Sequence, residues 1–171
     1  MKAIILESER LILKPLGLPF LSREYVNWMN DSDVNKFLSG GGDYSLDKLK
    51  IFLTEVEKKD ILFWAICIKN ESKHIGNIKI DPVEIKHGIC EYGIMMGDKN
   101  EWGKGFAKEA SKLVIEFCFK TLNLRKMNLG VIESNKRAVK LYEKLDFISE
   151  GKLINHVSSN GEFVNVLRMA L

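Results

Sequence analysis

The stretch Asp98-Lys99-Asn100-Glu101-Trp102-Gly103-Lys104-Gly105-Phe106-Ala107 places two glycines one residue apart, between a predicted strand and a predicted helix. Because glycine has no Cβ, Gly103 and Gly105 let the backbone approach a ligand and turn its N–H groups outward. The first turn of a helix adds unpaired N–H groups and a partial positive charge. These features favour a diphosphate site. A plain tight turn that enters a helix explains the same residues equally well.

Two better-known phosphate motifs are excluded at this position. A Rossmann site needs a third glycine and strands wound as βαβ units, whereas the strands before this turn are predicted to be linked by hairpins. A P-loop needs Gly-Lys-Ser or Gly-Lys-Thr, and neither follows.

Outward from the turn, hydrophobic periodicity predicts a strand, two helices, three strands, a helix, a strand, a helix and two strands. The predicted strands are 10–14, 62–68, 74–80, 89–96, 126–132, 147–153 and 163–171, and the predicted helices lie near 21–30, 46–56, 106–117 and 138–145. Hairpin-linked strands followed by βαβ crossovers predict the α/β (α+β) class, with a mixed, mostly antiparallel sheet and helices on both faces. We expect residues 1–171 to form a single domain.

Composition excludes several functional classes. The chain has 171 residues, 46% hydrophobic and 29% charged, with a net charge of +3. The basic residues do not cluster, so we expect no nucleic-acid partner. The longest apolar run, 61–68, is far shorter than the roughly 20 residues of a membrane-spanning helix. We therefore expect no membrane association, and the apolar start Met1–Leu6 is too short for a signal peptide.

The cysteines and histidines indicate neither a disulfide framework nor a metal centre. The three cysteines, Cys67, Cys90 and Cys118, lie in separate apolar segments and form no Cys-x-x-Cys pair. We expect buried free thiols, which suit a cytoplasmic protein. The three histidines share no metal-ligand spacing, so we expect no metal.

Two polar residues follow the next strand. Asn135 is a suitable N-cap for the helix that carries Tyr142 two turns later. Asn135 either only caps that helix or also bonds an extended, amide-bearing ligand. Tyr142 shares a face with apolar residues and is either a core tyrosine or a site residue. Helix starts at the carboxyl ends of adjacent strands open towards one crevice, which links Tyr142 to the glycine turn.

The combined pattern resembles the GCN5-related N-acetyltransferase (GNAT) superfamily from about Ile75 to the C-terminus. The matching segments are Glu91-Tyr92-Gly93-Ile94-Met95-Met96, Trp102 to Ala107, and Asn135 with Leu141 to Phe147. Glu9 to Leu16 resembles the start of the ribosomal-protein-alanine acetyltransferase-like branch. The tail, with Glu150 to Leu153, Asn160 to Phe163 and Arg168-Met169, is closest to spermidine/diamine N-acetyltransferases, and nucleotide-linked amino-sugar acetyltransferases have similar tails.

The resemblance implies a GNAT-like fold, acetyl-CoA as acyl donor and the following roles. The backbone of Ile94, Met95 and Met96 would hold the pantetheine arm, and Asn135 would contact it. The N–H groups of Trp102, Gly103, Lys104, Gly105, Phe106 and Ala107 would hold the diphosphate. Tyr142 would protonate the departing thiolate, and Glu91 would be a base or a substrate-binding carboxylate. For Glu91, an ordinary surface ion pair with a lysine stays an alternative.

Three positions depart from the family pattern. Asn100 replaces the Gln or Arg that usually begins the glycine turn, and Asp146 replaces a glycine before Phe147. Aspartate also adopts the left-handed conformation that ends helices, so the helix end is expected to survive. Some members that acetylate peptide amines place a catalytic Glu five residues before the Asn, where this chain has Gly130.

The expected function is acetyl-CoA-dependent N-acetylation of a primary amine on a small molecule of polyamine or diamine type. Asp31 and Asp33, in the segment expected to roof the acceptor pocket, suit a cationic amine. An amino-sugar nucleotide or a protein N-terminus is the alternative acceptor, and a non-catalytic acyl-CoA-binding module is the alternative of another class. The sequence leaves a homo-oligomer open.

Overall fold

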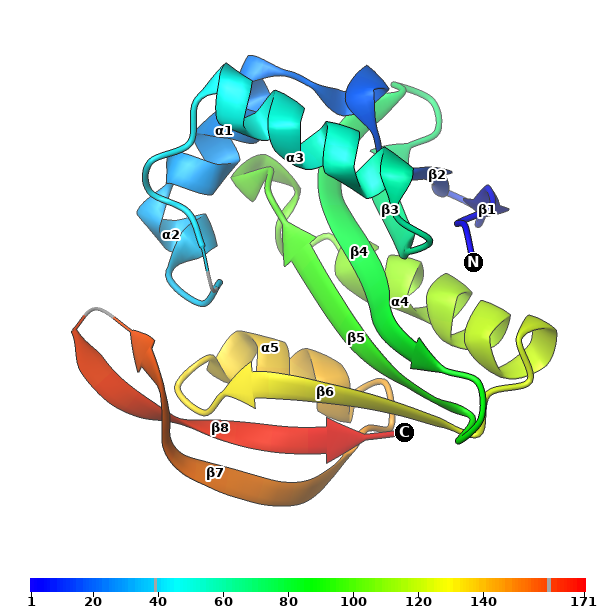
Figure 1. Ribbon diagram of the computed structural model, residues 1–171, viewed down its shortest axis with the longest axis vertical. Coiled ribbons are helices and arrows are strands. Elements are labelled where there is room, and N and C mark those ends of the chain that lie inside the picture. Colours follow the sequence, from blue (N-terminus) through cyan, green and yellow to red (C-terminus); the bar gives the residue numbers. More distant parts are fainter. Residues whose placement is uncertain (39, 160) are drawn as a thin grey trace.

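The computed structural model describes residues 1–38, 40–159 and 161–171. One eight-stranded sheet runs through the molecule in the order β1-β2-β3-β4-β5-β6-β8-β7 (Figure 1). Its strands are β1 (Leu6–Glu7), β2 (Leu11–Pro15), β3 (Leu62–Ile68), β4 (Lys73–Glu84), β5 (Ile89–Met96), β6 (Lys126–Ile132), β7 (Ile148–Ser159) and β8 (Glu162–Ala170). All neighbouring strands are antiparallel except β5 and β6.

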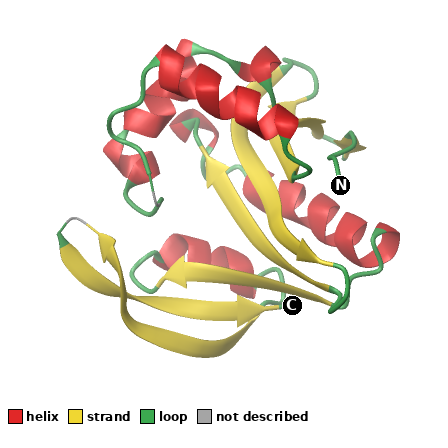
Figure 2. Cartoon of the chain, in the orientation of Figure 1, coloured by secondary structure: helices red, strands yellow, loops and turns green. Residues whose placement is uncertain are grey.

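Helices cover both faces of the sheet, as predicted (Figure 2). The α-helices are α1 (Arg23–Asn30), α2 (Ser32–Asn35), α3 (Leu46–Lys58), α4 (Phe106–Glu116) and α5 (Lys136–Glu143). Short 3₁₀ turns lie at Leu18–Phe20 and Lys99–Glu101, and a π-helical turn, Phe117–Thr121, ends α4. Ser45 caps α3 by accepting a hydrogen bond from the Lys48 amide.

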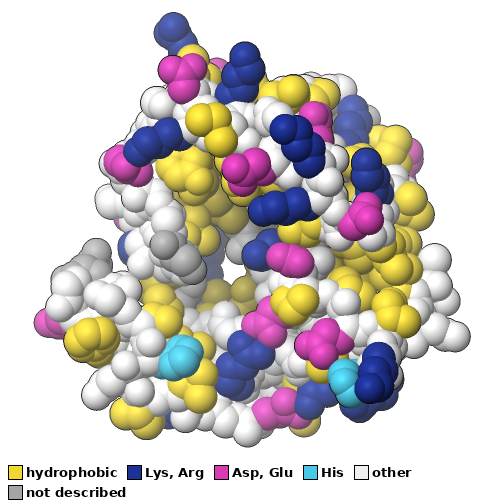
Figure 3. All heavy atoms as spheres, viewed as in Figure 1, with side chains coloured by type: hydrophobic (Ala, Val, Ile, Leu, Met, Phe, Trp, Pro, Cys, Tyr) yellow, Lys and Arg dark blue, Asp and Glu magenta, His cyan; other side chains and the backbone are white. Residues whose placement is uncertain are grey.

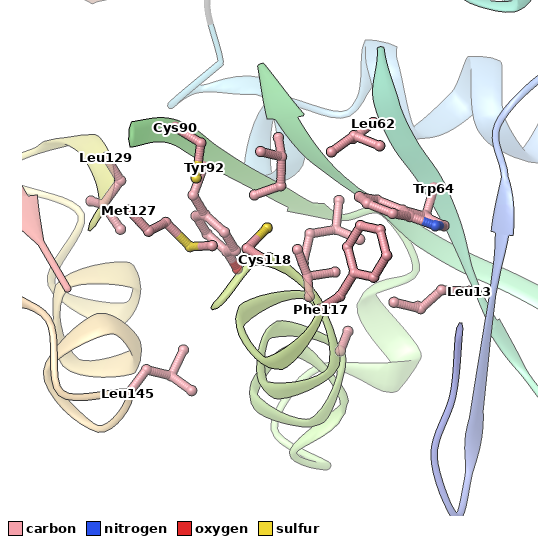
Figure 4. Close-up of a cluster of buried hydrophobic side chains, with 14 of the residues drawn as sticks. Leu13, Leu62, Trp64, Cys90, Tyr92, Phe117, Cys118, Met127, Leu129 and Leu145 are labelled. Carbon is pink, nitrogen blue, oxygen red and sulfur yellow. The ribbon is translucent and has the colours of Figure 1, made fainter. Parts of the chain in front are cut away.

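Strand alternation divides the core into two layers. On β3, Trp64 and Ile66 pack with the residues of α4 and α5, whereas Ala65 and Cys67 pack beneath α1 and α3. Figure 4 shows the larger cluster, in which the rings of Trp64 and Phe117 meet edge to face at 5.9 Å. The two layers fix which side chains of the sheet face each set of helices.

The sheet opens between β5 and β6. These strands pair only from Ile89 to Glu91, opposite Lys126 to Asn128. Beyond Glu91, β5 pairs with β4 alone, and beyond Asn128, β6 pairs with β8 alone. The two strands then diverge, as Figure 1 shows. Figure 3 shows a hollow in the surface between the helical layer and the β7–β8 hairpin. The divergence therefore exposes facing backbone edges within the sheet.

Some elements differ from the prediction. The two-residue strand β1 and the single-turn helix α2 were not expected, because each is too short to show a period. β4 and β7 run to Glu84 and Ser159, past the predicted ends, because each continues through a break in register. The tail segment 160–163, which carries part of the family resemblance, includes residue 160, which lies outside the described residues.

Candidate active site

The glycine turn has the backbone conformation that its sequence predicts. Gly103 and Gly105 have φ of 82° and 86°, in the left-handed region. Gly105 is the N-cap of α4, and no side chain caps that helix start. The Trp102 amide, which was expected to be one of the diphosphate donors, instead donates to the Lys99 carbonyl at 3.2 Å. Within the described chain, none of the amides of residues 103 to 107 donates a hydrogen bond, and the amide of the next residue, Lys108, is also unpaired. Six consecutive unpaired donors at a helix start form a cradle for an anion.

Arg10, which directly precedes β2, holds the cradle in place through three contacts. The Arg10 guanidinium donates to the Lys104 carbonyl at 3.1 Å and to the Glu109 carboxylate at 2.7 Å, and lies 4.5 Å from the centre of the Phe106 ring. Partial burial would raise the pKa of the Glu109 carboxyl, but hydrogen bonds from Ser8 and Arg10 outweigh it and hold the pKa below its usual value. These contacts fix the start of α4 relative to β2.

A second charged group supports the preceding turn. Glu101 is almost fully buried and its carboxylate binds Lys104 at 2.8 Å and Lys73 at 2.9 Å. Lys73 also binds Asp98 at 2.8 Å. The hydrogen bonds from Lys104 and Lys73 lower the pKa of the Glu101 carboxyl. The conformation of the turn is thus set by ion pairs to β4 and not by glycine alone.

The end of β5 is partly occupied by the turn itself. The Trp102 indole Nε1 donates to the Met96 carbonyl at 2.9 Å, so this carbonyl already has a partner. Ile94 and Met95 lie on the part of β5 that pairs with β4 alone. Of the three residues expected to hold an extended ligand arm, Ile94 directs its backbone groups at the divergence. Met95 lies opposite Asn77, in the register in which the Gly97 amide donates to the Ile75 carbonyl, so its backbone groups point to β4 and the expectation for Met95 is wrong.

Asn135 caps α5, as one of its two interpretations expected. Its side-chain oxygen accepts a hydrogen bond from the Ala138 amide at 3.2 Å. A cap uses only the oxygen, so the side-chain NH₂ group keeps two donors for a ligand. The capping interpretation of Asn135 is therefore confirmed, and its contact with a ligand stays a prediction that this geometry permits.

Tyr142 lies against two other rings at the base of the divergence. Its ring is 5.9 Å from those of Tyr92 and Phe147. The side chain is 7% exposed, and burial raises its pKa to about 12. The Tyr92 hydroxyl forms a hydrogen bond with the Ser111 hydroxyl at 2.6 Å. Within the described residues, the Tyr142 hydroxyl makes no hydrogen bond, which leaves it available to a ligand.

Glu91 is engaged by an arginine that the sequence did not indicate. Both of its carboxylate oxygens accept hydrogen bonds from Arg168, at 2.7 Å each. Arg168 reaches Glu91 across Gly130 of β6, where an added Cβ would lie only 3.1 Å from the guanidinium. The hydrogen bonds to Glu91 raise the pKa of Arg168. The ion-pair partner of Glu91 is therefore an arginine, whereas the alternative interpretation expected an ordinary surface ion pair with a lysine.

The acidic residues near the helical roof are also paired. Lys99, in the turn before the cradle, binds Asp31 at 2.5 Å and Asp33 at 3.2 Å. The hydrogen bond from Lys99 lowers the pKa of the Asp31 carboxyl. The Trp28 ring packs directly over Gly97, which has no room for a Cβ. The helical roof thus contacts the same segment that leads into the cradle.

The predicted site residues lie on β5 and on the segments that follow β5 and β6, on the two sides of the divergence. Two other depressions, of about 290 and 400 Å³, lie beside β7 and β8, and no residue of the cradle lines them. Among the described residues, none of the helices is long and apolar enough to cross a membrane.

A family model described as an acetyltransferase (GNAT) domain matches residues 10–148. The chain belongs to the GNAT family. Over 97% of this GNAT chain and 94% of the relative, it is 32% identical to an uncharacterized N-acetyltransferase, p20, of Bacillus licheniformis. It is 31% identical to spermidine N(1)-acetyltransferase of Escherichia coli K12 over 61% of this chain and 55% of that enzyme.

The fold of this GNAT chain also matches solved structures. Spermidine N-acetyltransferase from Vibrio cholerae, solved in complex with CoA and spermine, aligns with a TM-score of 0.85 and 25% identity over 96% of each chain. These matches confirm the predicted family and fold. The protein is an N-acetyltransferase that uses acetyl-CoA as its acyl donor.

Proposed function

We propose that this GNAT enzyme acetylates a primary amine of a small molecule of the polyamine or diamine class. The relatives named as spermidine acetyltransferases support this acceptor class. The chain spans about half the length of those relatives, with 55% and 54% coverage, so the support concerns the matched segment. The match to the Vibrio cholerae structure, over 96% of each chain, extends the support to the whole fold.

The donor half of the proposed site rests on the cradle. The amides of residues 103 to 108 suit a diphosphate, because they are unpaired and lie at the positive end of α4. The divergence of β5 from β6 leaves the Ile94 backbone groups and the Asn135 NH₂ group to bind the amide-bearing pantetheine arm. This run of free amides is the single observation that carries the proposed donor site.

The proposed reaction is direct transfer of the acetyl group from sulfur to nitrogen. The amine nitrogen forms a bond to the thioester carbon and loses one proton, while the carbon–sulfur bond breaks and the sulfur leaves as thiolate. At pH 7 the acceptor is an ammonium ion with a pKa near 10.4, and its conversion to the free amine before attack costs about 4.6 kcal/mol. A base or a relay of waters therefore has to receive a proton on the acceptor side.

Glu91 is the proposed acceptor-side group. Glu91 is the last residue of β5 that pairs with β6, and its side chain lies on the face of the sheet opposite that of Tyr92. Because Arg168 holds both oxygens, Glu91 receives a proton directly or through a water only as this ion pair loosens. Arg168 then orients the carboxylate and compensates its charge.

Tyr142 is the proposed acid on the donor side. With its pKa raised to about 12, the phenol is protonated at neutral pH and can donate to the departing sulfur. A thiol has a pKa near 8.5, so complete transfer from this phenol costs about 5 kcal/mol. Tyr142 therefore acts chiefly by hydrogen bonding to the developing thiolate, which then exchanges its proton with solvent.

An acceptor that carries an anionic group is the second candidate. The open face beside Glu91 also carries Arg168 and Lys79, whose side chain packs over Gly93. Two cations beside one carboxylate favour an amino-sugar nucleotide over a purely cationic amine. Thiol release from acetyl-CoA, measured against spermidine, diamines, amino-sugar nucleotides and an N-terminal peptide, separates these acceptors.

The proposal also covers the compartment, the partners and the oligomeric state of the enzyme. Three buried free thiols support a reducing cytoplasm. We include no nucleic-acid partner, because the net charge of +3 is small. A homo-oligomer is supported by the long exposed strand β7, which pairs only with β8 in the described chain.

A further inference from the structure

Arg137 occupies a defined position across the opening of the sheet. It lies in the first turn of α5, and its guanidinium carbon is 4.7 Å from the centre of the Trp102 ring. Trp102 is in turn fixed by its hydrogen bond to the Met96 carbonyl. The stack of Arg137 on Trp102 therefore connects α5, the helix that follows β6, with the end of β5. The negative face of the indole ring attracts the cation and helps to hold it in this position.

The guanidinium of Arg137 is uncommitted in the described part of the chain. It forms neither an ion pair nor a hydrogen bond there, whereas Lys104 of the cradle is paired with Glu101. Trp102 immediately precedes the six free amides, so Arg137 adjoins the cradle. A planar guanidinium presents several donors and binds phosphate oxygens in pairs. The stack thus holds a free, phosphate-binding group at the edge of an anion site.

We propose that Arg137 binds a phosphate of the acyl carrier and that Trp102 positions it to do so. The inference rests on the proposed donor site and adds to it a side chain that determines carrier specificity. The ligand is a phosphate oxygen, which CoA offers both in its diphosphate and in its 3′-phosphate. Dephospho-CoA keeps the first and lacks the second, so the two sources can be distinguished.

Calorimetric titration of CoA and of dephospho-CoA into the intact protein tests this inference. The variants are Arg137→Ala, Arg137→Lys and, as the matched control, Lys144→Ala. Lys144 is an exposed cation just past the other end of α5, without an ion pair among the described residues. A lost charged hydrogen bond weakens binding by about tenfold or more. We expect Arg137→Ala to weaken CoA binding by about tenfold, Arg137→Lys by less and Lys144→Ala not at all.

The readouts separate specific contact from loss of structure. With saturating acetyl-CoA, kcat of Arg137→Ala should stay within about twofold of wild type while KM for acetyl-CoA rises about tenfold. If the 3′-phosphate is the ligand, Arg137→Ala binds dephospho-CoA as the wild type does; if the diphosphate is the ligand, both carriers weaken together. Equal CoA binding by Arg137→Ala and wild type would overturn the inference alone. Failure of the wild type to bind CoA would overturn the donor site as well.

Discussion

The Arg168 guanidinium crosses the sheet from β8 to β5 and holds both carboxylate oxygens of Glu91 at 2.7 Å. This ion pair lies where the β5–β6 pairing ends, and Gly130 between them leaves the space through which the arginine passes. The pair both stabilises the closed end of the divergence and places a carboxylate on the acceptor side. Its two roles can be separated by mutation.

Glu91→Gln keeps the shape of the side chain and one hydrogen-bond acceptor but removes the charge. If Glu91 receives the proton of the amine, kcat at pH 7 should fall by about tenfold or more, with KM for acetyl-CoA unchanged. The difference in kcat between variant and wild type should shrink as the pH approaches 10.4, the pKa of the acceptor's ammonium group. At that pH, half of the acceptor is already the free amine. A variant with unchanged kcat across this range would assign proton removal to water and leave Glu91 a structural role.

Tyr142→Phe removes one hydroxyl from a buried ring. We expect CoA affinity to stay unchanged and kcat to fall by roughly 10- to 100-fold, since the departing sulfur loses its donor. Tyr92→Phe is the control, because it removes a neighbouring hydroxyl that bonds only Ser111. That control should lower the thermal midpoint and leave kcat near the wild-type value. Equal kcat for Tyr142→Phe and wild type would remove Tyr142 from the reaction.

Gly103→Ala tests the cradle through its backbone. A Cβ at Gly103 meets no atom within 4 Å, but its φ of 82° makes any other residue strained. The cost is about 1 kcal/mol in stability, and relaxation of that strain would misdirect the free amides. We expect KM for acetyl-CoA to rise by about tenfold.

Gly161→Ala is the matched control for this strain. Gly161 has a φ of 84° and equally open surroundings, in the distant β7–β8 hairpin. It should lose similar stability without a change in KM. The same KM in both variants would show that the cradle conformation does not matter for the donor.

Asp146 has a φ of 68° at the end of α5, where the Phe147 amide bonds the Tyr142 carbonyl at 3.0 Å. Asp146→Gly should relieve strain and stabilise the fold by about 0.5–1 kcal/mol, or about 2 °C in the thermal midpoint. Asp146→Ala should be less stable than wild type, because alanine has neither the freedom of glycine nor the polar side chain of aspartate. The opposite order of midpoints in a denaturation series would contradict this account of the helix end.

Local sequence predicted those features that depend on local physics. The periodicity of 106–117 gave α4, the Gly103–Gly105 spacing gave the left-handed turn, and Asn135 gave a helix cap. The left-handed Asp146 was also expected from its residue type. The roles of Tyr142, Glu91 and the cradle amides in catalysis and binding stay predictions.

The residues that sequence reasoning missed are paired over long separations. Arg168 meets Glu91 only because β8 pairs with β6 in the register that sets Arg168 opposite Gly130. Arg10 meets Glu109, and Arg137 meets Trp102, across elements whose packing no local pattern encodes. The Glu9–Leu16 resemblance offered one signal, since it included the arginine that fastens the cradle.

The central claim is that the free amides of residues 103 to 108 bind the phosphates of the acyl carrier. The most direct measurement is a titration of the ¹⁵N-labelled protein with CoA, followed by amide NMR signals. The account predicts that these six signals shift together and saturate with the calorimetric Kd, while the Gly161 signal does not move. Saturable CoA binding with these six signals unmoved would contradict it.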